Sequence, residues 1–172
     1  MKFLALVGGG VLLFAILLSG QASAQIARAE LYNAQGEKVG IATLMERSDG
    51  VAITLQVFKL PPGTHGFHIH AVGKCEPPGF TSAGGHFNPH GKKHGLKSPD
   101  GAHGGDLRNL EVRPDGTATT IRLASLVTLV PGMKSLFHPD GTALVIHADP
   151  DDYMTDPTGN AGARIACGFI TR

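Results

Sequence analysis

Two histidines separated by one residue form the first group in the chain that could bind a metal ion. They are His68 and His70, in the segment Gly66-Phe67-His68-Ile69-His70. Alternate side chains of a β-strand project from the same face about 7 Å apart, so both imidazoles would share one face while Phe67 and Ile69 face the core. The spacing predicts a chelating pair on a strand. For an isolated pair, two ordinary surface histidines are the alternative interpretation.

A second group of possible ligands follows downstream. His86, His94 and His103 are separated by seven and eight residues, and Asp106 comes three residues after the last of them. Three imidazoles and one carboxylate make a closed tetrahedral set suited to Zn²⁺. Glycines flank these residues and would let the loop fold tightly around an ion. His90 lies four residues from both His86 and His94, so it could replace His94 as a ligand if the loop had a different register.

A further histidine, His147, directly follows the apolar run of residues 143–146. Its imidazole is therefore expected at the end of a strand, next to a long loop. Ligation by several imidazole nitrogens suits Cu(II). Together the three groups predict a two-metal site of six histidines and one aspartate.

Short β-segments must position these residues. Apolar positions alternate with polar ones, turn signals recur roughly every ten residues, and no stretch has sustained helical periodicity. The expected strands are residues 27–33, 40–46, 51–58, 66–70, 109–113, 118–123, 141–147 and 164–170. This pattern predicts an all-β fold, an antiparallel sandwich or barrel. Two long loops, residues 71–106 and 148–163, interrupt the pattern, and long loops in compact domains are usually functional.

The first 24 residues differ from the rest of the chain. Lys2 is their one charged residue, and it precedes an apolar run over residues 3–18 that is about 16 residues long, short for a bilayer span. Ala22-Ser23-Ala24 has the small-x-small pattern that signal peptidase cuts. We interpret residues 1–24 as a cleaved signal peptide and residues 25–172 as one domain, exported to the periplasm or secreted and without stable membrane association. An uncleaved N-terminal anchor is the alternative.

Charge and cysteine content limit the function further. Residues 1–24 contain one of the 15 Lys and Arg and none of the 14 Asp and Glu, so the remaining chain is neutral and lacks the charge of a nucleic-acid-binding protein. Cys75 and Cys167 are the two cysteines, and in an exported protein they favour a disulfide over two buried free thiols. The loop so closed would contribute roughly 4–5 kcal/mol in the chain-entropy account.

Four blocks of the sequence together resemble the copper/zinc superoxide dismutases. They are residues 66–70, 84–89, 103–107 and 162–168, and the resemblance runs in order over essentially the whole chain after residue 24. It implies an eight-stranded antiparallel Greek-key fold with one copper and one zinc per subunit. By this resemblance the copper ligands are His68, His70, His86 and His147, and the zinc ligands are His86, His94, His103 and Asp106. His86 would bridge the two metals as an imidazolate.

The resemblance also assigns roles beyond the ligands. Arg164 matches an arginine at the mouth of the copper channel, where a permanently charged guanidinium suits a small anion. Asp151 matches a carboxylate that hydrogen-bonds one copper histidine and one zinc histidine and so orients both rings. Asp149 and Asp152 are close enough in sequence to be alternatives. Cys75 and Cys167 match the family's disulfide within one subunit.

The implied activity is the disproportionation of superoxide anion to O₂ and H₂O₂, with His86 as the proton carrier. The rival interpretation is a non-catalytic relative that stores or delivers copper or zinc. Family members include monomers and dimers, so a homodimer is possible. Of the remaining histidines, we expect His65 in a loop, His138 in a turn and His90 exposed to solvent.

Overall fold

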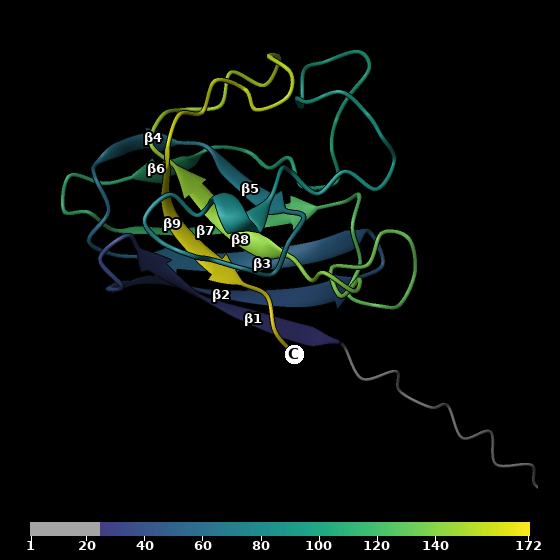
Figure 1. Cartoon of the computed structure of the whole chain (residues 1–172), viewed down its shortest axis with the longest axis horizontal. Helices are drawn as coiled ribbons and strands as arrows, with labels where there is room; N and C mark the ends of the chain where they lie inside the picture. The colour runs from purple at the N-terminus through teal and green to yellow at the C-terminus, as the bar shows by residue number, and fades with distance from the viewer. Residues whose placement is uncertain (1–24) are drawn as a thin grey trace, which may run out of the picture.

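A computed structural model describes residues 25–172 of the chain (Figure 1). The predicted signal peptide lies outside the described residues. Within them, no helix is long and apolar enough to cross a membrane. The strands are β1 (Ile26–Asn33), β2 (Lys38–Arg47), β3 (Gly50–Val57), β4 (Gly63–His65), β5 (Phe67–His70), β6 (Leu110–Val112), β7 (Ala118–Ala124), β8 (Ala143–His147) and β9 (Arg164–Phe169). A single 3-10 turn, η1 (Thr81–Ala83), is the one helical element in this part of the chain.

Seven of the strands form one curled antiparallel sheet in the order β5-β8-β9-β1-β2-β3-β7, and β4 pairs with β6 in a small second sheet. The predicted all-β antiparallel fold is thus confirmed: all eight expected strands are present, and the described residues contain one more. Strand β4 is the addition. It is three residues long, too short to show alternation, and only Gly66 separates it from β5, so the sequence does not reveal it.

Burial along the strands explains which side of the sheet forms the core. In β1 the side chains of Ala27, Ala29 and Leu31 are buried, whereas Arg28 and Glu30 between them are exposed. Such alternation is typical of a sheet with one face toward the core. Strands β5 and β8 differ, because every residue in them is buried. Their outer face lies beneath the long loops rather than in solvent.

The loop of residues 71–106, here called the metal loop, runs alongside the free edge of β5. The N–H of Ile69 donates to the carbonyl of Gly105 at 2.9 Å, and the carbonyl of Ile69 accepts from the N–H of Phe87 at 2.8 Å. A Cβ at Gly105 would overlap the Ile69 carbonyl, so only glycine allows this close approach. The second long loop, residues 148–163, lies on the same side of the strands as the metal loop (Figure 1).

Candidate metal centre

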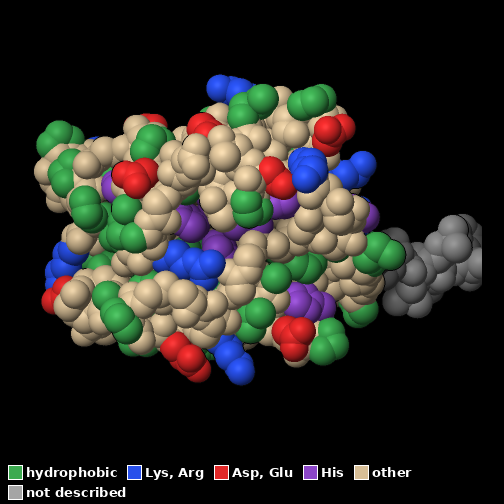
Figure 2. All heavy atoms as spheres, turned by 45° about the horizontal axis from the view of Figure 1, so that its top comes forward, with side chains coloured by type: hydrophobic (Ala, Val, Ile, Leu, Met, Phe, Trp, Pro, Cys, Tyr) green, Lys and Arg blue, Asp and Glu red, His purple; other side chains and the backbone are tan. Residues whose placement is uncertain are grey.

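Backbone pairing along β5 brings together ligands that are distant in sequence. His70 pairs with His86, and His68 pairs with Asp106, in isolated antiparallel bridges between β5 and the metal loop. His147 ends β8, the strand that pairs with β5 on its other side. The strand edge therefore places the predicted copper ligands next to the predicted zinc ligands. Figure 2 shows histidine side chains inside a hollow of the surface, with a basic side chain beside them.

The first cluster contains His68, His70, His86 and His147, all buried, with one nitrogen of each within 4.8 Å of the others. His70 donates from Nδ1 to the carbonyl of Gly84 at 2.9 Å, and His147 donates from Nδ1 to that of Gly162 at 3.3 Å. Both rings consequently turn an unprotonated Nε2 inward, and these two atoms lie 3.3 Å apart. Two facing nitrogen lone pairs attract each other only through a shared cation, so this arrangement fits a metal ion.

Two further nitrogens of the first cluster support the same conclusion. His68 donates from Nε2 to Asp151 at 2.8 Å, which leaves its Nδ1 buried without a hydrogen-bond partner. Nε2 of His86 is also buried and has no partner within the protein. Buried polar atoms are rarely left unpaired, and a metal ion bound between these nitrogens would satisfy both. Imidazole nitrogens without carboxylate oxygens form the donor set that copper accepts.

The second cluster contains His86, His94, His103 and Asp106, again all buried. The Nδ1 atoms of the three histidines lie 2.9, 3.0 and 3.4 Å from the same oxygen, Oδ1 of Asp106. Ligands on a tetrahedral zinc with bonds near 2.1 Å are roughly 3.4 Å apart, so the cluster has nearly the dimensions of a zinc site. Oδ2 of Asp106 accepts the N–H groups of Gly95 and His103 at 2.8 and 2.9 Å, which leaves Oδ1 for the metal.

The pKa values of the second cluster reflect its buried carboxylate. Burial opposes ionisation of Asp106, but the close contact with His103 and the hydrogen bonds from His86 and His94 outweigh it and hold the pKa of Asp106 far below its usual range. Burial likewise opposes the charged form of His94, but the carboxylates of Asp106 and Asp151 raise the pKa of His94 to about 9. Burial lowers the pKa of His86 to about 4 despite its bond with Asp106. Zinc binding at Nδ1 of His86 or His94 must therefore displace the proton that this atom donates to Asp106.

Asp151 lies between the two clusters. Its Oδ2 accepts from Nε2 of His68 at 2.8 Å, and its Oδ1 accepts from Nε2 of His94 at 3.0 Å. Asp152 was an alternative to Asp151 for this role. It instead accepts hydrogen bonds from Thr155 and Asn160 within its own exposed loop. One carboxylate thus fixes the tautomers of two ligands, one from each cluster.

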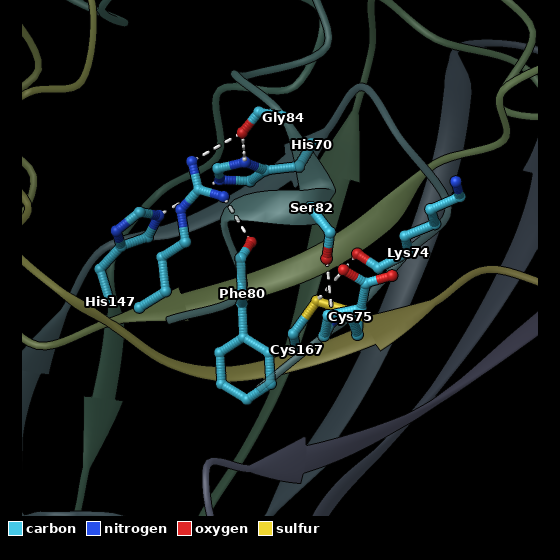
Figure 3. Close-up of a disulfide and its surroundings, with 10 residues drawn as sticks. His70, Lys74, Cys75, Phe80, Ser82, Gly84, His147 and Cys167 are labelled. Carbon is cyan, nitrogen blue, oxygen red and sulfur yellow. Dashed lines mark hydrogen bonds between the residues drawn. A yellow bond between two sulfur atoms is a disulfide. The ribbon is translucent and has the colours of Figure 1, made fainter. Parts of the chain in front are cut away.

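The disulfide predicted between Cys75 and Cys167 is confirmed, and it joins the metal loop to β9 (Figure 3). Arg164 begins β9, three residues before Cys167. Its guanidinium donates to the carbonyls of Phe80 and Gly84, both at 2.6 Å, and Gly84 also accepts from the ring of His70. The loop that the disulfide holds therefore supplies the carbonyls that orient Arg164 next to the first cluster.

The three other histidines lie outside both clusters. His90 is exposed and His138 lies in a turn, as expected. The expectation for His65 was wrong, because this residue is buried in β4 and not in a loop. Its Nδ1 lies 2.8 Å from the carbonyl of His147, and its Nε2 lies 2.9 Å from that of Pro61. It supports the backbone of a copper ligand, a role that no sequence pattern indicated.

We expect His94→Ala to abolish stoichiometric zinc binding and His90→Ala to leave it unchanged. His94 contributes one of four atoms around the zinc position, whereas the ring of His90 is in solvent. Metal analysis of the purified, zinc-loaded variants checks this difference. Normal zinc content in His94→Ala together with a loss in His90→Ala would reverse the ligand assignment.

An antiparallel β-sheet that carries adjoining histidine clusters, one with a carboxylate, defines a protein with a binuclear metal site. The family model for copper/zinc superoxide dismutase matches residues 38–170. "Superoxide dismutase [Cu-Zn] 2" of Aquifex aeolicus is 52% identical over 165 residues, which cover 94% of this chain and 96% of that protein. "Superoxide dismutase [Cu-Zn]" of Caulobacter vibrioides is 42% identical over 138 residues, 78% of this chain and 79% of that protein.

A solved structure gives the same result. The crystal structure of a superoxide dismutase-like protein from Bacillus subtilis has a TM-score of 0.80 at 41% identity, covering 83% of this chain and 96% of that chain. The chain belongs to the copper/zinc superoxide dismutase family. It is a superoxide dismutase with an intact copper site of four histidines and an intact zinc site of three histidines and one aspartate.

Proposed function

We propose that this protein is an exported superoxide dismutase in which Arg164 and His86 are the catalytic residues and Asp151 orients the metal ligands. The observation that carries the proposal is the arrangement of seven buried ligands as two clusters that share His86. Each nitrogen of its ring belongs to a different cluster. Nδ1 faces Asp106 at 2.9 Å, and Nε2 lies among the copper ligands without a protein partner.

The copper ion, when bound, supplies one-electron chemistry, oxidising one superoxide to O₂ and reducing the next to H₂O₂. The ring of His86 can then serve as the proton carrier. With Nδ1 held at the zinc position, Nε2 would be the atom that takes up one proton and later gives it to the reduced product, whose second proton would come from solvent.

Arg164 is suited to hold the superoxide anion. Its guanidinium is half-buried, and two of its N–H groups are committed to the carbonyls of Phe80 and Gly84. The positive charge contributes to the lowered pKa values of His70 and His147, after burial and neighbouring histidines, which supports a position close to the copper ligands. An anion drawn to this charge would therefore arrive next to the copper cluster.

We expect Arg164→Gln to slow superoxide consumption by about tenfold or more at low ionic strength, because electrostatic attraction typically raises association rates by 10–10³. Arg164→Lys keeps the charge but loses the planar group that donates to two carbonyls. Its rate should therefore lie between the rates of wild type and Arg164→Gln. Stopped-flow decay of superoxide at several salt concentrations checks this. Metal content should remain normal, and an unchanged rate in Arg164→Gln would remove Arg164 from the catalytic machinery.

The rival function is the storage or delivery of metal by a non-catalytic relative. Such a protein is expected to lack a copper ligand or Arg164, and this chain has all of them. The deciding experiment is to express residues 25–172, load them with both metals and assay superoxide. Protein that contains copper and zinc yet leaves superoxide unconsumed would support storage and contradict the enzyme.

Export is proposed from the signal-peptide pattern of residues 1–24 and from the Cys75–Cys167 disulfide, a bond that persists in oxidising compartments. Cell fractionation followed by N-terminal sequencing tests it. We expect the protein in the periplasm or medium with Gln25 as its first residue. Full-length protein retained in the membrane would favour an uncleaved anchor.

A homodimer is proposed from the outer face of the large sheet. Ile26 pairs with Met45, Met45 with Ala52, and Ala52 with Leu123, which makes one apolar row across four strands. Ile26, Met45 and Leu123 remain 48%, 43% and 47% exposed. A second copy could cover this row face to face. Sedimentation velocity of wild type and Met45→Lys tests the proposal, which fails if the wild type is a monomer or the variant is still a dimer.

A further inference from the structure

Tyr153 lies where the two long loops meet. Its hydroxyl accepts the N–H of Asn109 at 2.8 Å, and its main-chain carbonyl accepts the N–H of Lys97 at 3.1 Å. The ammonium group of Lys97 also lies 5.2 Å from the centre of the tyrosine ring. Tyr153 thus joins the second loop both to the metal loop and to the residue that precedes β6.

The backbone around Tyr153 is closely fitted to a zinc-ligand segment. Tyr153 has a left-handed φ of 66°, and the main chain at Gly95 approaches its carbonyl so closely that a Cβ on Gly95 would overlap it. Gly95 directly follows the zinc ligand His94, and its N–H donates to Asp106, another zinc ligand, at 2.8 Å. A shift of Tyr153 would therefore move the segment that holds both ligands.

Tyr153 also acts on Asp151. Its N–H donates to Oδ1 of Asp151 at 2.7 Å. Asn109, which the tyrosine hydroxyl holds, forms two reciprocal hydrogen bonds of 3.0 Å with the main chain of Asp151. The Asp151 carboxylate in turn accepts from His94 at 3.0 Å and from His68 at 2.8 Å. An unbroken chain of contacts thus runs from the tyrosine hydroxyl to a ligand of each metal.

We propose that Tyr153 is a positioning residue for the zinc site, which slows zinc release by holding Asp151, and through it the ring of His94, in place. The proposal rests on the role of Asp151 in the proposed function but not on superoxide chemistry. Partners outside the ligand set commonly change metal affinity by about 10–100-fold, and an indirect partner belongs at the lower end of that range.

The test is the rate at which zinc-loaded protein, prepared without copper, loses Zn²⁺ to a chromogenic chelator. We expect Tyr153→Phe to release zinc about tenfold faster than wild type. The matched control is Tyr32→Phe, because Tyr32 is the one other tyrosine in the chain and its hydroxyl donates to Glu30 at the exposed surface. Co²⁺ in the zinc site gives a second readout, and its visible absorption bands should broaden or shift in Tyr153→Phe alone.

A double variant separates positioning from general destabilisation. If Tyr153 acts through Asp151, adding Tyr153→Phe to Asp151→Asn should not accelerate zinc release beyond Asp151→Asn alone. Fully additive effects would overturn the proposal, as would a wild-type release rate and Co²⁺ spectrum in Tyr153→Phe. Because no superoxide is used, an inactive enzyme would contradict the proposed function while leaving this inference standing.

Discussion

His147→Ala should eliminate superoxide dismutation while zinc remains bound. The Nε2 of His147 lies 3.3 Å from that of His70 in the copper cluster, and the residue takes no part in the zinc cluster. Its loss removes one of four copper ligands. Since mutation of even the outer partners of a metal site costs about 10–100-fold, we expect the rate to fall by more than a hundredfold. Metal analysis together with stopped-flow superoxide decay measures both quantities.

The matched comparison is His94→Ala, which removes a ligand from the other cluster. Zinc should be lost in that variant, so the two alanine variants should show opposite effects on metal content. His138→Ala is the inert control, because this residue stacks on Phe87 in a turn outside both clusters. Loss of zinc from His147→Ala with activity intact would refute the division of ligands between copper and zinc.

The second large effect is expected from the disulfide. Cys75 and Cys167 are 92 residues apart, and closing a loop of that size removes chain entropy worth about 4–5 kcal/mol from the unfolded state. Replacing both cysteines by serine should lower the free energy of unfolding by about that amount. Urea denaturation of metal-free protein measures it without contributions from bound ions.

The control is wild-type protein unfolded under reducing conditions, and its free energy of unfolding should equal that of the serine variant. A loss below about 1 kcal/mol in both samples would contradict the chain-entropy account.

The serine variant should also lose activity, because the disulfide holds the loop whose carbonyls at Phe80 and Gly84 orient Arg164. Normal activity in fully metal-loaded serine variant would show that the orientation of Arg164 does not depend on the disulfide.

The parts of this protein that sequence could predict are those governed by local periodicity or by a family pattern. Alternation places Phe67 and Ile69 in the core, with His68 and His70 on the opposite face. The choice between His90 and His94 needed the structure. There the side chain of Asn88 bonds both the N–H and the carbonyl of Lys92, which closes a turn that leaves His90 in solvent.

The residues that sequence reasoning missed are held by contacts between distant segments. His65 lies opposite Leu110 in the small sheet, and its ring reaches the carbonyl of His147. Tyr153 bonds Asn109, 44 residues away, from a loop that has no periodicity. Neither contact produces a pattern in the neighbouring sequence, because both depend on how the metal loop and the second loop fold over the sheet.

The pairing of the metal loop with β5 has a consequence for solubility. β5 is the terminal strand of the large sheet, and its free edge is covered by three backbone hydrogen bonds, from Ile69 to Gly105, from Phe87 to Ile69 and from Ala71 to Gly85. Uncovered strand edges readily pair with other chains. The segments that cover this edge contain His86, His103 and Asp106, so a zinc ion held by these residues would also help to keep β5 from recruiting a strand of a neighbouring molecule.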